Sequence, residues 1–300
     1  MTMIRPFVLW VIVGVLARSA AAENRPEVKS KAVAVIDAET GAEIFGKNAD
    51  EIRAIASTTK IFVAMAVRKK GIDLDGWTEI TRVDVKQARG GARTRLDIRR
   101  VFRNKDLLRA MLMASDNRAP SALGRAAGMS LDELIAAMND IAKDLHLKRT
   151  KFTDVTGLRG NVSTAREMAI ALRAALQDDV LREIMNDDFE VIVGKGGKPK
   201  IPYGNTNQAL LAHKYDVIGG KTGYTQAAKY CFITGAKFKG REVMMVFLGA
   251  GAKATRFADF NRVAAWLESG APGSTVTLDG GAKRPKLKVD GEVRGRVAKK

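Results

Sequence analysis

The chain has 300 residues with 51 Lys and Arg against 33 Asp and Glu, so its formal net charge at pH 7 is +18. Its single Cys excludes an intrachain disulfide, and with only 2 His there is little material for a zinc site, which needs three or four ligands. We therefore predict no metal ion and no cofactor. A hydrophobic content of 46% is enough for a buried core, whereas the charge alone fits nucleic-acid binding, an anionic surface or simple solubility.

The first 22 residues have the order of a secretory signal peptide. Arg5 precedes an apolar run at 7–17, and the alanines at 20–22 provide a cleavage site. The run is shorter than the roughly 20 residues that a membrane-spanning helix needs. We predict an exported protein, in the periplasm or on the wall side of the cytoplasmic membrane, with no nucleic-acid partner. An uncleaved membrane anchor and a buried N-terminal helix are the alternatives.

The remaining chain begins with strand patterns. Residues 31–37 and 42–46 are β-type runs that flank a Glu-Thr-Gly turn, which predicts a hairpin. Residues 61–67 are apolar on every side and predict a buried helix, because a surface helix would carry a polar face.

Helical signals occupy the middle of the chain. Asn104 is placed to cap a helix, while Ser130 with Glu133 and Thr164 with Glu167 have the spacing of capping boxes. We therefore expect a block of several helices between the first strands and the last ones.

Strand patterns return after this block. Residues 189–193 alternate in polarity, 194–202 form a loop rich in Gly, Lys and Pro, and 229–238 are expected to pair with 241–248. Residues 254–268 have the periodicity of a last amphipathic helix. Strands from both ends of the chain with helices between them predict the α+β class: an antiparallel sheet flanked by helices, with an inserted all-helical subdomain.

The last segment, 271–300, carries eight basic residues against three acidic ones. We expect a mobile basic tail that makes peripheral contact with a membrane or an anionic wall polymer. A short hairpin is the alternative for the same residues.

Ser57 and Lys60 stand three positions apart at the start of the predicted buried helix, so their side chains share one face. A serine hydroxyl needs a base to take its proton, and in a chain so poor in His that base has to be another residue. Burial lowers the pKa of a lysine and so favours the neutral amine that can act as a base. The helix N-terminus adds N–H groups for a developing oxyanion.

Two further strings strengthen this pair. Ser-Asp-Asn at 115–117 follows an apolar helix and predicts a turn, and Lys-Thr-Gly at 221–223 predicts part of a strand. From average composition, S-x-x-K is expected about once in 300 residues, but S-D-N and K-T-G only about 0.05 times each. All three together are therefore far from a chance outcome.

This set resembles that of the serine D-alanyl-D-alanine carboxypeptidases and endopeptidases, the low-molecular-mass penicillin-binding proteins of peptidase family S11. The resemblance covers about residues 28–268 and includes FTDVTGL at 152–158 and STAREM at 163–168. It implies a β-lactamase/DD-peptidase-like fold with residues 23–270 as the catalytic domain. It also implies peptidoglycan stem peptides as substrates and β-lactams as covalent inhibitors.

The same resemblance implies a role for each motif residue. Ser57 would be the acylated nucleophile, Lys60 its general base, and Ser115 a proton relay to the leaving amine. The expected substrate-binding residues are Asn117, Lys221, Thr222, Gly223 and Tyr224. The backbone N–H of Tyr224 would also face the oxyanion.

The implied reaction is that of a serine-type D-Ala-D-Ala carboxypeptidase acting through a Ser57 acyl-enzyme. The strings at 117–125 and 205–207 look more like the DD-endopeptidase branch, which cuts D-Ala cross-links, so this alternative stays open. A penicillin-binding sensor without turnover is a third reading. A class A β-lactamase needs a Glu some 35 residues beyond S-D-N, and here Asp154 is the only acid in that region, so we expect slow penicillin hydrolysis.

Other reactive residues receive structural interpretations. His146 ends a helix, His213 is expected near the rim of the site, and Cys231 reads as a buried small hydrophobe. One basic cluster forms either a solvated hairpin or a surface that faces the anionic wall; its members are Arg93, Arg95, Arg99, Arg100, Arg103 and Lys105.

Overall fold

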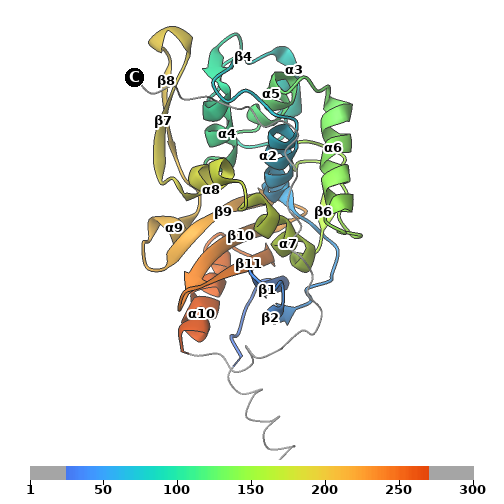
Figure 1. Cartoon of the computed structure of the whole chain (residues 1–300), viewed down its shortest axis with the longest axis vertical. Helices are drawn as coiled ribbons and strands as arrows, with labels where there is room; N and C mark the ends of the chain where they lie inside the picture. The colour runs from blue at the N-terminus through green and yellow to red at the C-terminus, as the bar shows by residue number, and fades with distance from the viewer. Residues whose placement is uncertain (1–24, 270–300) are drawn as a thin grey trace, which may run out of the picture.

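The computed structural model describes residues 25–269 (Figure 1), so the predicted signal peptide at 1–22 and the predicted tail at 271–300 lie outside the described residues. A five-stranded antiparallel sheet has the order β2-β1-β11-β10-β9. Its strands are β1 (Ala32–Asp37), β2 (Glu43–Lys47), β9 (Asp216–Thr225), β10 (Lys229–Phe238) and β11 (Arg241–Ala250).

The first and last strands of the chain pair with each other. β1 lies antiparallel to β11, with Ala32 opposite Leu248 and Asp37 opposite Val243. The predicted hairpins are present as β1–β2 and β10–β11. The α+β class with an antiparallel sheet is therefore confirmed.

Alternating side chains bury both faces of the sheet. On β11, Met244 and Val246 join the core that contains α2 and α7, whereas Met245 and Phe247 join the core under α10. The helices are α2 (Lys60–Lys69), α3 (Arg82–Gln87), α4 (Asn104–Leu112), α5 (Ala119–Ala126), α6 (Leu131–Asp144), α7 (Ala165–Ala175), α8 (Asp179–Asn186), α9 (Gln208–Leu211) and α10 (Thr255–Glu268).

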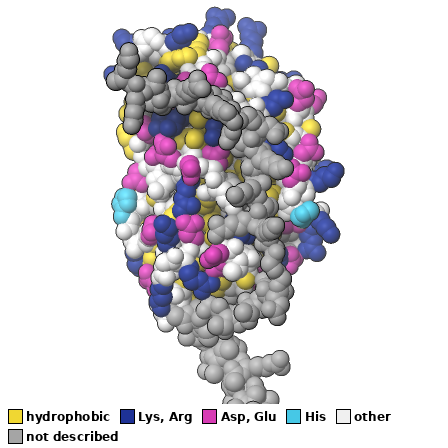
Figure 2. Space-filling model, viewed as in Figure 1, with side chains coloured by type: hydrophobic (Ala, Val, Ile, Leu, Met, Phe, Trp, Pro, Cys, Tyr) yellow, Lys and Arg dark blue, Asp and Glu magenta, His cyan; other side chains and the backbone are white. Residues whose placement is uncertain are grey.

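Helix α2 is the centre of the helical part. Each of its residues from Lys60 to Val67 is buried, as its apolar sequence predicts, because α4, α5, α6 and α7 pack around it (Figure 1). Within residues 25–269, no helix is both long and apolar enough to cross a bilayer. Figure 2 shows Lys and Arg side chains interspersed with Asp and Glu over one face of the molecule.

Short two-stranded ribbons complete the fold. Two of these ribbons lie side by side, because Phe102 of one forms a β-bridge with Gly194 in the turn of the other. The pairs are β3 (Arg53–Ala54) with β6 (Val162–Ser163), β4 (Trp77–Glu79) with β5 (Val101–Arg103), and β7 (Phe189–Val193) with β8 (Lys200–Gly204). Two 3-10 turns are η1 (Ala56–Thr59) and η2 (Lys195–Gly197).

Two local predictions need correction. Asn104 does not cap α4: its side chain accepts a hydrogen bond from Thr78 Oγ1 at 2.7 Å and donates to the Asp73 carbonyl at 2.7 Å. The predicted loop at 194–202 is also too long, because β8 already begins at Lys200. In both cases a tertiary contact or strand pairing decided the structure of a locally ambiguous segment.

Of the two predicted capping boxes, one is complete. Ser130 and Glu133 bond each other's backbone at the start of α6. Thr164 Oγ1 accepts from Glu167 N at 3.1 Å, but the Glu167 carboxylate accepts from the Arg149 N–H at 2.9 Å instead. Glu167 thus anchors the segment before α7 rather than closing the box.

Candidate active site

The three motifs come together at the N-terminal end of α2. Ser57 lies in the 3-10 turn η1 rather than in the first turn of an α-helix, yet it reaches Lys60 as expected. The Ser-Asp-Asn string fills the turn between α4 and α5, and the Lys-Thr-Gly string lies on β9, the edge strand of the sheet. Both structural settings predicted for these strings are confirmed.

The Lys60 amine is held by three oxygen atoms. Nζ lies 2.7 Å from Ser57 Oγ, 2.7 Å from Asn117 Oδ1 and 2.9 Å from the Thr156 carbonyl oxygen. The side chain is 0% exposed, whereas Ser57 is 8% exposed and still reachable from solvent. Lys60 therefore links the first two motifs in a dry environment.

Burial lowers the pKa of Lys60 to about 7, and the negative charges of Asp116 and Asp154 oppose that shift. A neutral amine keeps two N–H donors and one lone pair. The amide oxygen of Asn117 and the carbonyl of Thr156 can only accept, so the lone pair must face Ser57, whose hydroxyl can donate. The geometry thus suits proton removal from Ser57 by neutral Lys60.

Hydrogen bonds to Asp116 fix the turn of the second motif. Its carboxylate accepts from the Arg95 N–H at 3.0 Å, the Arg118 N–H at 2.9 Å and the Tyr203 hydroxyl at 3.0 Å. Burial raises the pKa of Tyr203, so the phenol stays a neutral donor. The preceding Ser115 has a positive φ of 64°, a conformation that non-glycine residues adopt only when their surroundings impose it.

Lys221 of β9 is a second buried amine close to this site. It is 1% exposed, and its Nζ donates to the Thr222 carbonyl at 2.8 Å. Burial, followed by the charge of Lys60, lowers the pKa of Lys221 well below its ordinary value. Thr222 Oγ1 donates to Thr206 Oγ1 at 2.7 Å, while Tyr224 is half-exposed at the edge.

Gly223 allows β9 to approach the 3-10 turn closely. A Cβ atom at this position would lie 2.9 Å from the Ser57 nitrogen and 3.2 Å from the Ile55 carbonyl oxygen. Both are backbone atoms that cannot move aside easily. The absence of a side chain thus lets the open edge of β9 run beside Ser57, where an extended peptide can add as a further strand.

Two buried groups near the motifs were missed from the sequence. The guanidinium of Arg256 on α10 donates to the Gly223 carbonyl at 2.9 Å and the Cys231 carbonyl at 2.7 Å, and burial lowers the pKa of Arg256 to about 10. A charged residue on the same helical face as buried Phe260 and Val263 was the available signal. The Thr156 carbonyl, by contrast, leaves no signature in the sequence.

The histidines make no contact with the three motifs among the described hydrogen bonds, whereas Cys231 is the cross-strand partner of Gly223. His146 is exposed just beyond α6. His213 Nε2 lies 3.0 Å from Asp188 Oδ2, in a hollow lined by Tyr215 and Asp216 that contains no residue of the three motifs. Cys231 is buried in β10, as predicted.

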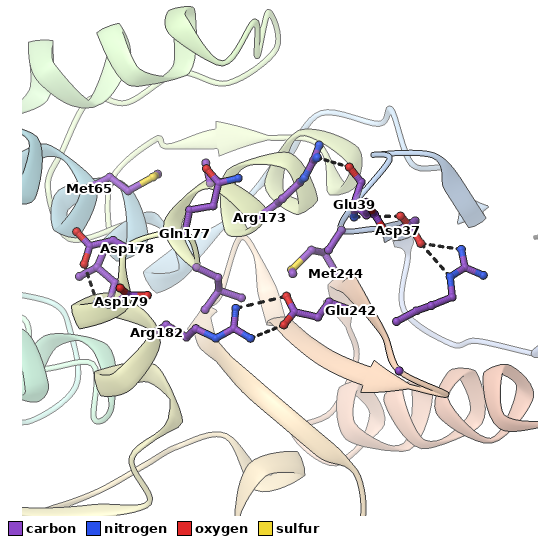
Figure 3. Close-up of a pocket in the computed structure, with 16 residues that line it drawn as sticks. Asp37, Glu39, Met65, Arg173, Gln177, Asp178, Asp179, Arg182, Glu242 and Met244 are labelled. Atoms are coloured by element: carbon purple, nitrogen blue, oxygen red, sulfur yellow. Dashed lines mark hydrogen bonds and ion pairs between the residues drawn. The ribbon is translucent and has the colours of Figure 1, made fainter. Parts of the chain in front are cut away.

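A cavity of about 650 Å³ lies elsewhere, where the second turn of α2 meets the end of the sheet (Figure 3). Met65 is part of its apolar lining. The ion pairs of Arg241 with Asp37 and of Arg182 with Glu242 form part of its polar lining. It contains no residue of the three motifs. The cavity is therefore separate from the cluster of the three motifs.

Comparison with known proteins gives a consistent result. Residues 19–252 match the family described as D-alanyl-D-alanine carboxypeptidase. The D-alanyl-D-alanine endopeptidase of Escherichia coli K12 is 31% identical over 260 residues, which cover 85% of this chain and 83% of that protein. The endopeptidase of Pseudomonas aeruginosa is 30% identical over 267 residues, with coverage of 89% and 85%.

A solved structure supports the fold. The Streptomyces K15 DD-transpeptidase matches with a TM-score of 0.75 and 24% identity, over 82% of this chain and 99% of that one. The β-lactamase/DD-peptidase-like architecture expected from the sequence is thereby confirmed. The chain belongs to the D-alanyl-D-alanine carboxypeptidase family and is a serine-type D-Ala-D-Ala peptidase.

Proposed function

We propose that the chain cleaves the terminal D-Ala-D-Ala bond of peptidoglycan stem peptides through an acyl-enzyme on Ser57, as a carboxypeptidase. Neutral Lys60 takes the Ser57 proton while Oγ attacks the carbonyl carbon. The peptide C–N bond then breaks, and Ser115 passes a proton to the departing D-Ala amine. Water later hydrolyses the ester. The observation that carries this proposal is the 2.7 Å contact between Lys60 Nζ and Ser57 Oγ in a buried setting.

The substrate-binding residues are assigned around this pair. The terminal carboxylate is bound by Lys221 and Thr222, and Gly223 lets the peptide lie along the edge of β9. The backbone N–H groups of Ser57 and Tyr224 face the oxyanion. Asn117, whose oxygen is already engaged by Lys60, contributes its amide donor to the peptide backbone.

Labelling with a fluorescent penicillin tests the nucleophile. The wild-type chain should label covalently, and Ser57→Ala should not, because Ser57 is the one serine in the described structure whose Oγ hydrogen-bonds a buried lysine amine. Ser269→Ala, which removes an exposed hydroxyl at the end of α10, is the matched control and should label normally. A wild type that does not label, or a Ser57→Ala variant that does, refutes the proposal.

Endopeptidase activity on D-Ala cross-links is the second candidate. It is favoured by the relatives from Escherichia coli, Pseudomonas aeruginosa and Haemophilus influenzae, which are named D-alanyl-D-alanine endopeptidases. We expect cross-linked muropeptides to be converted to monomers alongside D-Ala release from pentapeptides, since one catalytic set serves both bonds. Free D-Ala from pentapeptides alone would exclude this candidate, and labelling without product from either substrate would support a sensor.

The chain's behaviour toward β-lactams follows from the surroundings of Asp154. This buried carboxylate accepts backbone hydrogen bonds from Thr156 and Gly157, each at 3.1 Å, so it is committed to the loop. Asp116, the other acid whose charge acts on Lys60, is likewise held by three hydrogen bonds, so neither carboxylate is free to activate water and the penicilloyl ester should turn over about 10³-fold more slowly than it forms. A chromogenic β-lactam should therefore give one equivalent of product and then nearly stop. Continued fast hydrolysis would contradict this.

The domain limits and location extend the proposal. Residues 1–22 act as a signal peptide for export to the periplasm or the outer side of the cytoplasmic membrane, 23–270 form the catalytic domain, and 271–300 form a basic tail that contacts a membrane or wall polymer. Two observations support the export. The charged, apolar and small-residue parts of 1–22 stand in the order of a signal peptide, and peptidoglycan, the substrate expected for this family, lies outside the cytoplasm. Intact mass of the exported chain should show a new N-terminus at Glu23.

A further inference from the structure

An exposed aromatic ring surrounded by cations lies at the end of the molecule that carries β4 and the tip of the β7–β8 ribbon. Trp77 is 40% exposed, with the Arg103 guanidinium 5.3 Å and the Lys195 amine 6.0 Å from its ring centroid. Lys198, at the end of the same turn as Lys195, and Lys200, the first residue of β8, are exposed as well. We call these five residues the Trp77 patch.

Two pairings build this patch from distant parts of the chain. Trp77 and Arg103 are direct cross-strand partners in the β4–β5 ribbon. The bridge between Phe102 and Gly194 then brings the Lys-rich tip of β7–β8 alongside that ribbon. The patch therefore sits on paired backbone rather than on a loose loop.

The patch has more positive charge than its own ion pairs neutralise. Arg103 pairs with Asp75 at 2.9 Å, but Lys195, Lys198 and Lys200 have no acidic group within 4.0 Å among residues 25–269. Figure 2 shows Lys and Arg side chains at this end of the molecule next to exposed apolar ones. An apolar surface bordered by unneutralised cations is typical of a binding site for an anionic partner with flat, apolar faces.

Strand β8 connects this patch to the third motif. It runs from Lys200 at the tip toward Thr206, which contacts Thr222 of the third motif. The chain from Lys198 to Thr206 spans about 25 Å at roughly 3.3 Å per residue. The two terminal residues of a stem peptide extend only about 7 Å. A short peptide bound beside Ser57 therefore leaves the patch free, whereas a polymer can reach both Ser57 and the patch.

We propose that the Trp77 patch is a second binding site for the substrate polymer, with sugar rings packed on Trp77 and carboxylates of neighbouring stem peptides paired with the three lysines. The inference rests on the proposed function, because peptidoglycan is chosen as the ligand on the ground that it is the proposed substrate. Two contacts on one polymer raise the effective concentration of peptide beside Ser57, which increases affinity without altering the chemistry. The lysine contribution should weaken with salt.

The test uses the full chain carrying Trp77→Ala, Lys195→Gln, Lys198→Gln and Lys200→Gln. Co-sedimentation with purified insoluble peptidoglycan, measured in a Ser57→Ala background, should fall at least about fivefold. In the active enzyme, fluorescent penicillin labelling and turnover of a soluble pentapeptide should stay unchanged, while turnover of insoluble peptidoglycan falls. If the Trp77→Ala chain is poorly folded by circular dichroism, Trp77→Phe with the same lysine changes replaces it.

The matched control removes three exposed lysines elsewhere, Lys143, Lys148 and Lys237, each changed to Gln. The control should co-sediment like the wild type. Equal loss of co-sedimentation in the control, or unchanged co-sedimentation of the patch variant, would overturn the proposal. So would a patch variant that loses binding to anionic lipid vesicles but still binds peptidoglycan like the wild type. A wild type that fails to label with penicillin would instead refute the catalytic assignment, so the two failures are distinguishable.

Discussion

Replacing Lys60 with Arg should slow acylation of Ser57 by about 10³-fold while the fold remains intact. The guanidinium keeps the positive charge and can still donate hydrogen bonds, but it does not lose its proton at any pH at which the protein is folded. It therefore has no lone pair for the Ser57 hydroxyl. The measurement is the rate of fluorescent penicillin labelling at saturating probe, with thermal unfolding as the check on folding.

The wild type should show the matching pH dependence. Because the pKa of Lys60 lies at about 7, acylation should rise about tenfold per pH unit below pH 7, as the neutral amine becomes populated, and should level off above it. Lys60→Arg should lose this inflection near pH 7. A wild-type rate that stays constant between pH 5 and 9, or an Arg variant that labels as fast as the wild type, would contradict the role of Lys60 as base.

Residues whose chemistry fixes their type were predictable from the sequence. Ser57 and Lys60 had to lie three positions apart to meet, and the scarcity of His required a base of another kind. The apolar run of α2 and the nearly continuous apolar runs of β10 and β11 likewise predicted burial, because such runs leave no polar face for solvent. Local rules of spacing and polarity thus gave the sheet, the central helix and the motif positions.

Contacts between distant segments could not be predicted in this way. The Thr156 carbonyl reaches Lys60 across 96 positions, and Tyr203 reaches Asp116 across 87. Neither contact requires a distinctive residue type nearby in the sequence. The same reason explains the missed role of Asn104, whose side chain met Thr78 rather than its own helix. The sequence does not show how distant loops are placed relative to one another, because these loops pack together only after the sheet and α2 are formed.

One such packing contact, at Gly157, holds the loop that accepts the Lys60 hydrogen bond. Gly157 has a φ of 85°, and a Cβ atom there would lie 2.0 Å from the Ala56 carbonyl oxygen and 3.0 Å from the Ser57 nitrogen. These are backbone atoms of η1, so no side-chain rotation relieves the overlap. An added methyl group must push apart the two segments that present the Thr156 carbonyl and Ser57 to Lys60.

Gly157→Ala should therefore lower the free energy of unfolding by about 4 kcal/mol or more and slow penicillin labelling of the molecules that still fold. Gly128→Ala is the matched control, because Gly128 has a similar φ of 70° but no atom within 4 Å of the added methyl group. It should cost only the backbone strain, about 1 to 2 kcal/mol, and label normally. Urea unfolding and labelling rates of both variants decide the matter. Equal destabilisation would mean that strain alone, and not the contact with η1, makes glycine necessary at position 157.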